Sequence, residues 1–313
     1  MAILVLTSAA GAPGTTTTAL GLALTWPGPT LLVEADPAGS AIVPGWYRSS
    51  IDATERNLVR IATADAYTDI ARAVLDQCVR LTDDEDTERL LLMGYSEPAL
   101  APVLRDWWEP LGDAFRTLSD QGYTVIVDAG RITQGSYPER LLYRADQVLM
   151  VCRTAMASVV RSEGMTGQLR QLLASVGAAD RLGVVVIGGH GWMRVDAGQV
   201  AREFGAKISI AIPEDQDGAA VLSDGIPQRR RRRWGRKTAE DAGSSDDRRH
   251  DAPHRVGVPS DDEGDGYADA EELAPTTSTL MRSFRDAART LDQHLNRAAQ
   301  RQAPPPLQDE ESA

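Results

Sequence analysis

Apolar residues in the first two thirds of the chain fall into short runs separated by longer, helix-like patterns. The runs lie at Ile3–Thr7, Thr30–Glu34, Arg89–Met93, Thr124–Asp128, Gln147–Cys152, Gly183–Ile187 and Lys207–Ile212. Most of them are continuously apolar rather than alternating, which is typical of parallel strands covered on both faces. The pattern predicts an α/β fold, a doubly wound and mostly parallel sheet of about seven strands with helices on both faces.

Helix-length segments connect these strands. We expect helices at Tyr67–Arg80, Leu100–Ser119, Val159–Val176 and Ala197–Phe204, with Pro110 kinking or dividing the second. Ligands of doubly wound sheets bind outside the carboxyl ends of the strands, where the connecting loops converge. Candidate functional residues are therefore sought at that edge of the predicted sheet.

The pattern changes after Pro227. The segment Arg229–Lys237 is densely basic, and residues 238–275 are rich in Asp, Glu, Gly, Ser and Pro, which is typical of a disordered linker. Apolar residues then recur at steps of three or four and predict an amphipathic helix, which we expect to form only on a partner or surface because an isolated helix is marginal in water. The predicted layout is a folded domain at 1–227, the basic run and linker at 228–276, the helix at 277–302 and a disordered tail at 303–313.

Composition narrows the classes of function. The 313-residue chain carries a net charge of −12, which argues against a protein that coats nucleic acid with its whole surface. Cys78 and Cys152 are its only cysteines, too few for a zinc site or a disulfide framework. No basic leader precedes the first strand, and no segment approaches the roughly 18 apolar residues of a membrane span. We expect a cytoplasmic protein, with peripheral attachment at the inner face of the membrane as an alternative.

The loop after the first predicted strand has the strand–loop–helix setting of a P-loop. Its backbone N–H groups and the positive end of the following helix favour an anion. Thr16 falls where a P-loop threonine or serine ligates Mg²⁺. A loop that merely joins strand to helix is the alternative for this motif taken alone. The candidate phosphate-binding residues are Gly11, Ala12, Pro13, Gly14, Thr15, Thr16 and Thr17.

This loop has no lysine. Thr15 stands where a P-loop lysine reaches the phosphates, and the only lysines of the chain are Lys207 and Lys237. A neutral threonine does not replace the charge that stabilises phosphoryl transfer. The sequence therefore predicts weakened nucleotide binding and impaired hydrolysis.

Acidic residues follow two of the predicted strands. Asp128 ends an apolar run, which is the Walker-B arrangement that holds Mg²⁺. Glu34 and Asp36 close another strand on alternate positions, so both point into the cleft or one of them caps a turn. We expect Thr16, Asp36 and Asp128 to hold the metal and Asp36 to serve catalysis, although each acid alone could be a strand-end turn residue.

The order of these segments resembles the MinD/ParA family of deviant P-loop ATPases over residues 1 to about 227. The matching segments are the glycine loop, Glu34–Pro37, Val127–Gly130, Ala145–Val151, Ile212–Gln216 and Asp224–Pro227. The resemblance implies ATP or ADP with Mg²⁺ as the ligand, a homodimer as the assembly, and Pro213 and Glu214 beside the adenine.

The chain departs from the family pattern at both loop lysines, whose places are taken by Ala10 and Thr15. The family's adenine-contacting Asn is not evident either, since Ile187–His190 stands in its place. His190 and Trp192 lie in that loop and either cover the base or form a loop tip. Degenerate loops of this kind resemble the CpaE/TadZ branch, which positions pilus-assembly machinery.

The resemblance to the family and the departures from its pattern leave three candidate functions. The first is a spatial regulator or scaffold that binds nucleotide and hydrolyses it weakly or not at all. The second is an active ATPase for chromosome or plasmid partitioning or septum placement, with Arg131 or Arg153 replacing the loop lysine, and the third is a scaffold with an empty loop. The predicted helix would meet an acidic protein partner or an anionic membrane, and Arg229–Lys237 would contact DNA nonspecifically, anionic lipid or the acidic linker.

Overall fold

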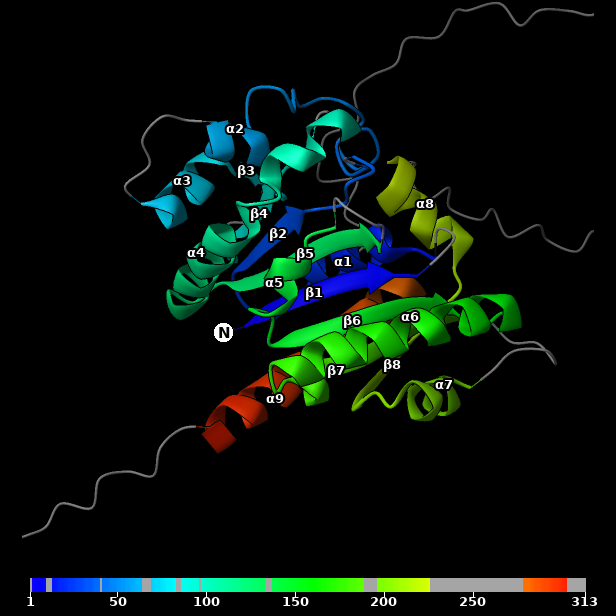
Figure 1. The fold of residues 1–313 in the computed structure, drawn as a ribbon. Helices are drawn as coiled ribbons and strands as arrows, with labels where there is room; N and C mark the ends of the chain where they lie inside the picture. Colours follow the sequence, from blue (N-terminus) through cyan, green and yellow to red (C-terminus); the bar gives the residue numbers. More distant parts are fainter. Residues whose placement is uncertain are drawn as a thin grey trace, which may run out of the picture.

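The computed structural model describes residues 2–9, 13–39, 41–63, 69–82, 86–95, 97–132, 137–188, 196–225 and 278–302. Its centre is an eight-stranded sheet in the order β3-β4-β2-β5-β1-β6-β7-β8, with helices on both faces (Figure 1). The strands are β1 Ile3–Ser8, β2 Thr30–Glu34, β3 Val79–Arg80, β4 Arg89–Leu92, β5 Thr124–Arg131, β6 Gln147–Arg153, β7 Leu182–Gly188 and β8 Ile208–Pro213. Every pairing is parallel except that of β3 with β4, which confirms the predicted fold class.

The helices cover both faces of this sheet. They are α1 Thr15–Thr25, α2 Leu58–Thr63, α3 Ile70–Gln77, α4 Trp108–Asp120, α5 Glu139–Leu142, α6 Met156–Ser175, α7 Ala197–Phe204, α8 Gln216–Asp224 and α9 Thr279–Gln302, with 3₁₀ turns at Pro98–Leu104 and Ala179–Arg181. The helix α7 has the predicted bounds. The predicted helix 100–119 is divided, but the division lies at residues 105–107. Pro110 sits instead in the first turn of α4, where its missing N–H leaves no hydrogen bond unmade.

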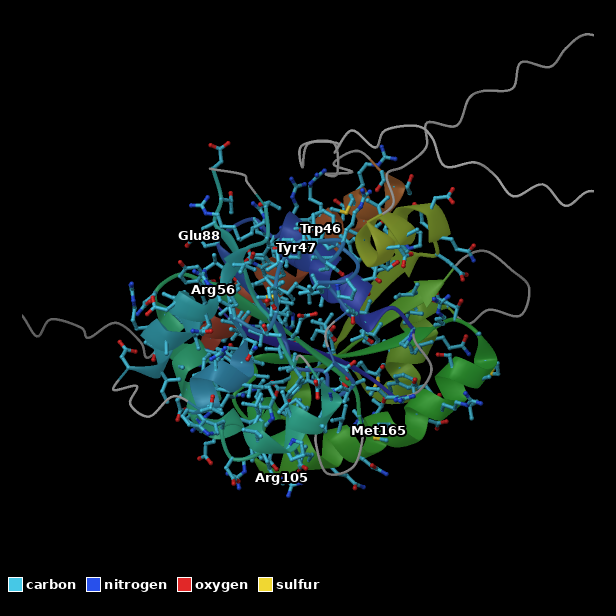
Figure 2. All side chains as sticks on the ribbon, turned by 90° about the horizontal axis from the view of Figure 1, so that it is seen from above. Trp46, Tyr47, Arg56, Glu88, Arg105 and Met165 are labelled. Carbon is cyan, nitrogen blue, oxygen red and sulfur yellow. The ribbon has the colours of Figure 1, made fainter. Side chains whose placement is uncertain are left out.

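The edge strand β3 is absent from the sequence prediction because two residues carry too little pattern. Side chains from a preceding turn hold it in place. The indole N–H of Trp46 donates to the Leu81 carbonyl at 3.2 Å, and the Tyr47 hydroxyl donates to the Arg80 carbonyl at 2.5 Å. Figure 2 shows Trp46 and Tyr47 close together on one side of the molecule. The antiparallel edge therefore depends on contacts from a distant part of the chain.

The strand β1 lies in the middle of the sheet and has apolar side chains on both faces. Ile3 and Val5 pack into a core with helices α2 to α7, whereas Leu4 and Leu6 pack into a second core with α1 and α9. Since successive side chains of a strand point to opposite faces, a strand covered on both sides must be apolar throughout. This explains why the strands of the sequence do not alternate.

The C-terminal helix α9 packs on the domain beside α1 (Figure 1), so the prediction that it forms only on a partner or surface is wrong. Its apolar stripe is buried against α1, α8 and β8. The ring of Phe284 lies directly on the backbone of α1 at Gly21, where a Cβ atom would overlap it. Arg282, Arg289 and Arg297 are exposed on the outer side. The predicted basic run and linker 228–276 and the tail 303–313 lie outside the described residues.

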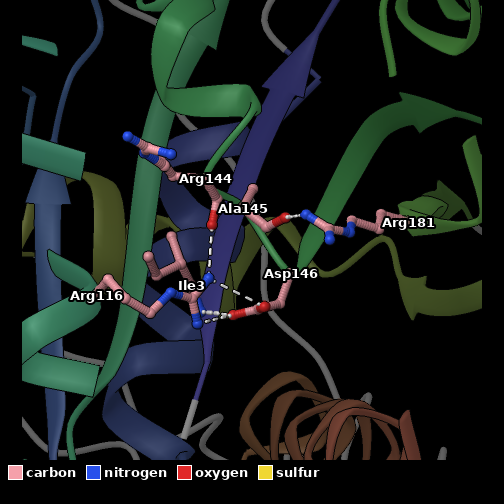
Figure 3. Close-up of polar contacts among 6 residues, drawn as sticks. All are labelled: Ile3, Arg116, Arg144, Ala145, Asp146 and Arg181. Carbon is pink, nitrogen blue, oxygen red and sulfur yellow. Dashed lines mark hydrogen bonds and ion pairs between the residues drawn. The ribbon is translucent and has the colours of Figure 1, made fainter. Parts of the chain in front are cut away.

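A polar network fixes the amino end of β1 (Figure 3). The carboxylate of Asp146 accepts hydrogen bonds from the backbone N–H of Ile3 at 2.8 Å and from both terminal nitrogens of Arg116 at 2.9 and 3.1 Å. Arg116 also donates to the Arg144 carbonyl at 2.7 Å, and Arg181 donates to the Ala145 carbonyl at 2.9 Å. The network joins the start of β1 to α4 and to the turn before β6.

We expect the Asp146→Ala substitution to lower the free energy of unfolding by about 1–3 kcal/mol, because it removes the partner of a backbone N–H and of a guanidinium. Urea unfolding measures this loss. The control is Asp113→Ala, which removes a neighbouring ion pair. Asp113 lies 2.8 Å from Arg144, and the Asp113 side chain is 60% exposed. That change should cost no more than about 1 kcal/mol. Equal losses for the two variants would contradict the structural role of the network.

The docking of α9 gives a second expectation. The Phe284→Ala substitution should lower the free energy of unfolding by about 3–5 kcal/mol, because it removes a buried aromatic ring and leaves a cavity against α1. The exposed Arg289→Ala change on the same helix should alter it by less than about 0.5 kcal/mol. A loss below about 1 kcal/mol for Phe284→Ala would show that α9 does not contribute to the domain core.

Candidate functional site

The amino end of α1 lies just beyond β1, and its cap is a glycine. Gly14 has a φ of 105°, a left-handed conformation that favours glycine, and it has no side chain with which to cap the helix. The carbonyl of Gly14 accepts hydrogen bonds from the backbone N–H and the hydroxyl of Thr18, at 2.9 and 2.7 Å. The first turn of α1 contains no acidic residue. This end of the helix therefore keeps the electropositive character that favours an anion.

The predicted phosphate loop is only partly described. Gly11 and Ala12, together with Ala10, lie outside the described residues. The remaining predicted residues, Pro13 to Thr17, lie at the entry to α1. The Thr15 side chain is 6% exposed, and its hydroxyl oxygen has no hydrogen-bond partner among the residues that the structure describes. A buried hydroxyl without a partner costs about 1–3 kcal/mol, so a ligand atom that bonded to it would be stabilising.

Thr16 and Asp128, two residues of the predicted metal site, lie next to each other. The Asp128 carboxylate, at the carboxyl end of β5, accepts hydrogen bonds from the Thr16 hydroxyl and from the backbone N–H of Gly130, the latter at 3.0 Å. Asp128 is 2% exposed. This burial raises the pKa of Asp128 to about 7, although the two hydrogen bonds to its carboxylate lower the pKa. The negative charges of Asp36 and Glu34 raise this pKa further. A divalent cation here would favour the ionised carboxylate.

Asp36 lies beside Asp128. Its carboxylate sits over the Cα atom of Gly130, where a side chain would overlap it, and Gly130 has a φ of 60°. The backbone N–H of Ala38 donates to the Asp36 carboxylate at 2.8 Å. Burial raises the pKa of Asp36, whereas the Ala38 hydrogen bond and the positive charge of Arg131 lower it. Two carboxylates and the Thr16 hydroxyl thus gather at the edge of the sheet where α1 begins.

Glu34 does not join this group, which decides between the two arrangements that the sequence left open. Its carboxylate accepts hydrogen bonds from the backbone N–H groups of Ile42 at 3.0 Å and Gly94 at 3.4 Å. The residue is 3% exposed. Glu34 therefore caps two loops, and Asp36 is the acid of this pair that faces the candidate site.

A cavity of about 120 Å³ opens beside the amino end of α1. Its walls include Gly14 and Thr17 from the loop and first turn, and Pro213 and Glu214 from the end of β8. Glu214 forms a 2.9 Å ion pair with Arg153, which also lines the cavity. The structure thus brings the predicted base-contacting residues next to the predicted phosphate loop.

Other lining residues were missed by the sequence prediction. Ile187 packs close to the loop, because a Cβ atom added to Gly14 would lie 3.2 Å from its side chain. Leu280 and Phe284 of α9 also line the cavity. No signal in the sequence identifies them as lining residues, because their position depends on how β7 ends and where α9 docks. His190 and Trp192 lie outside the described residues.

The acids at the site are too few to enclose a metal alone. Within the described ranges, no cluster of three or more His, Cys, Asp and Glu side chains could hold a metal ion. Two carboxylates and a hydroxyl do fit Mg²⁺, which takes few protein ligands and completes its shell with water and phosphate oxygens. The described parts of the chain also contain no helix long and apolar enough to cross a membrane.

Comparison of the whole structure with solved structures decides the type of fold. MinD of Aquifex aeolicus superposes with a TM-score of 0.58 at 16% identity, over 94% of this chain and 98% of that chain. A ParA family ATPase of Chlorobium tepidum gives a TM-score of 0.59 at 15% identity, over 92% and 98%. The chain has the fold of the MinD/ParA ATPases.

A third relative carries a ligand. The septum site-determining protein MinD of Pyrococcus horikoshii, in complex with Mg-ADP, superposes with a TM-score of 0.57 at 14% identity, over 94% of this chain and 96% of that one. No protein-family model and no curated protein sequence matches the chain. The likeness therefore extends over most of the chain in structure, and the site must be judged on its own residues.

The raised pKa of Asp128 predicts how stability changes with pH. Because the folded pKa of about 7 lies above the ordinary value of 3.8, the stabilising contribution of the neutral acid is full below pH 3.8 and is lost as the pH rises through 7. The Asp128→Asn variant cannot ionise. We expect its free energy of unfolding to rise relative to the parent between pH 5 and 8, by at most about 1.4 kcal/mol per pH unit.

Urea unfolding at pH 5, 6, 7 and 8, without divalent cations, measures this difference. The control is Asp113→Asn in the exposed part of α4, whose difference from the parent should stay constant across the series. Parallel profiles for the parent and Asp128→Asn would show that Asp128 is ionised throughout in the folded protein.

Proposed function

We propose that this protein is a nucleotide-binding spatial regulator or scaffold whose phosphate loop binds Mg²⁺-nucleotide weakly and hydrolyses it slowly or not at all. One observation carries the proposal. The Thr16 hydroxyl bonds to the buried Asp128 carboxylate at the amino end of α1, with Asp36 beside them. A helix terminus for phosphate next to three oxygen ligands is the arrangement that a Mg²⁺-nucleotide requires.

The residues take the following roles in this proposal. The loop from Gly11 to Thr17, with Ala12 and Pro13 in it, cradles the phosphates through its backbone N–H groups and through the Thr15 hydroxyl, which has no partner among the described residues. Thr16, Asp36 and Asp128 hold Mg²⁺ or its water ligands, and Pro213 and Glu214 lie beside the base. When bound, Mg²⁺ supplies positive charge to the phosphate oxygens. The Mg-ADP complex of the Pyrococcus horikoshii relative supports this choice of ligand.

Weak hydrolysis is expected because the loop lacks the positive charge of a lysine. Asp36 would orient an attacking water, but stabilising the transferred phosphoryl group requires a cation near the phosphates. Arg153 is engaged by Glu214 at 2.9 Å, and Arg131 is exposed. Neither arginine is held at the loop in the way that a P-loop lysine is.

An active ATPase for chromosome or plasmid partitioning or septum placement is the second candidate. It is favoured by Arg153, because this side chain lines the same cavity as Gly14 and Thr17. If Glu214 released it, the guanidinium would supply the missing charge. Turnover separates this candidate from the regulator.

The cellular role rests on the resemblance. We propose a homodimer in the cytoplasm or at the inner face of the membrane that positions a cellular assembly, such as the pilus-assembly machinery of the CpaE/TadZ branch. Because the apolar stripe of α9 is buried, an acidic protein or an anionic membrane would meet the exposed arginines of α9. The basic run Arg229–Lys237 remains a candidate for nonspecific contact with DNA.

Calorimetry with the full chain tests the proposed function. We expect Mg-ADP and Mg-ATP to bind with a Kd of about 0.1–1 mM. Thr16→Val should weaken this binding about tenfold because it removes a metal ligand, whereas both proteins should bind equally poorly without Mg²⁺. Thr25→Val is the matched control, since its hydroxyl donates to the Gly21 carbonyl at the far end of α1.

The outcomes separate the three candidates. Binding without phosphate release above background supports the regulator. Steady turnover that is lost in both Asp36→Ala and Arg153→Gln identifies the active ATPase instead. No heat and no thermal shift with millimolar nucleotide would leave only a scaffold with an empty loop.

A further inference from the structure

The cavity beside α1 has one wall from a part of the chain distant in sequence. Pro13, Gly14 and Thr17 form the wall at the phosphate loop, and Pro213 and Glu214 form the wall at the end of β8. Another wall comes from α9. Leu280 and Phe284 line the cavity although both belong to the C-terminal helix, and they are only 3% and 1% exposed.

We propose that α9 is part of the ligand site: Leu280 and Phe284 form the apolar surface against which the ring of a bound nucleotide lies, so that ligand binding and α9 docking stabilise each other. This inference rests on the proposed function, because it assumes that the cavity accepts a nucleotide. It assigns to the terminal helix a role in binding that its amphipathic pattern does not indicate.

Two glycines allow α9 to pack closely enough to form this wall. The absence of a side chain at Gly21 lets the Phe284 ring rest on the backbone of α1. At Gly218 in α8, a Cβ atom would lie 3.1 Å from the Cβ of Leu280. The backbone N–H of Gly218 donates to the Asp215 carboxylate at 2.9 Å, and Asp215 directly follows Glu214. The position of α9 is therefore coupled through packing to the segment that supplies Pro213 and Glu214.

The residues that line the cavity suit a nucleotide, which has a planar base and anionic phosphates. Ile187 and Ile212 are apolar and face the cavity together with Leu280 and Phe284. The other walls of the same cavity are polar and include the Arg153–Glu214 ion pair, Asp215, Gln216 and Thr17 at the amino end of α1. Ring binding sites of this kind are mostly apolar with a few placed polar groups.

The sign of the coupling follows from the geometry. The cavity exists while α9 is docked, so the helix builds the wall and does not block the site. A ligand that contacts the docked helix binds this state better than any state in which the helix has left, and it must shift the equilibrium toward docking. An empty site would release α9 more readily and expose its apolar stripe together with the surface of α1 beneath it.

Calorimetry with Mg-ADP and the full chain tests the wall. Leu280→Ala should weaken binding about tenfold, because a site loses roughly this much for a missing apolar contact. Leu291→Ala is the matched control: it is the same substitution at a fully buried position of the same helix that does not line the cavity. It should change the Kd by less than about twofold as long as α9 stays mostly docked.

Hydrogen exchange of the unmodified chain tests the coupling without any variant. Saturating Mg-ADP should slow exchange of the α9 amides, because release of the helix becomes rarer. The amides of α7, which does not line the cavity, should be unchanged. This measurement decides the question if Leu280→Ala fails to fold.

The results distinguish this inference from the function on which it rests. If the unmodified protein does not bind Mg-ADP, both the proposed function and the wall are wrong. If it binds, but Leu280→Ala and Leu291→Ala have equal Kd values and α9 exchange is unaffected, the nucleotide site stands and the inference about α9 is overturned. A selective loss in Leu280→Ala with protection of α9 supports it.

Discussion

The site depends on the pairing of β1 between β5 and β6. In this register Leu6 lies opposite Asp128 on one side and Leu149 on the other. Because parallel strands end at the same edge of a sheet, the start of α1, the Asp128 carboxylate and the end of β6 meet there. An irregularity between Leu6 and Ser8 accompanies the left-handed Gly130, whose carbonyl accepts a hydrogen bond from the Thr7 hydroxyl at 3.1 Å. The Asp36 carboxylate lies against this glycine.

Two acids set the electrostatics at this edge: Asp128 is buried and Asp36 is partly buried. Burial raises the pKa of both Asp128 and Asp36, and the positive charge of the exposed Arg131 lowers the pKa of Asp36. A loop lysine would add positive charge here, but Thr15 does not. A ligand that brings its own divalent cation relieves the carboxylates and the phosphates at once. In the proposed function, the missing lysine would weaken nucleotide binding and phosphoryl transfer, and Mg²⁺ would supply part of the positive charge that the loop lacks.

The terminal helix shows how an amphipathic pattern can be misread. An apolar stripe with flanking arginines fits a membrane surface, a partner groove or the helix's own domain equally well. Contact with Gly21 and Gly218 favours the domain, because the two glycines leave room for Phe284 and Leu280. These glycines lie far from α9 in the sequence, so no local pattern links them to it. The same contacts make α9 a wall of the cavity.

The sequence by itself determined the α/β class and seven of the eight strands, and it predicted that Thr16, Asp36 and Asp128 lie at one edge of the sheet. These features follow from local rules: continuous apolar runs mark strands covered on both faces, and parallel topology brings their carboxyl ends together. Tertiary structure alone decided that Glu34 caps loops while Asp36 faces the site, that β3 forms an edge held by Trp46 and Tyr47, and that α9 docks beside α1. Each of these choices depends on packing and hydrogen bonds between residues distant in the chain, which hydrophobic periodicity does not encode.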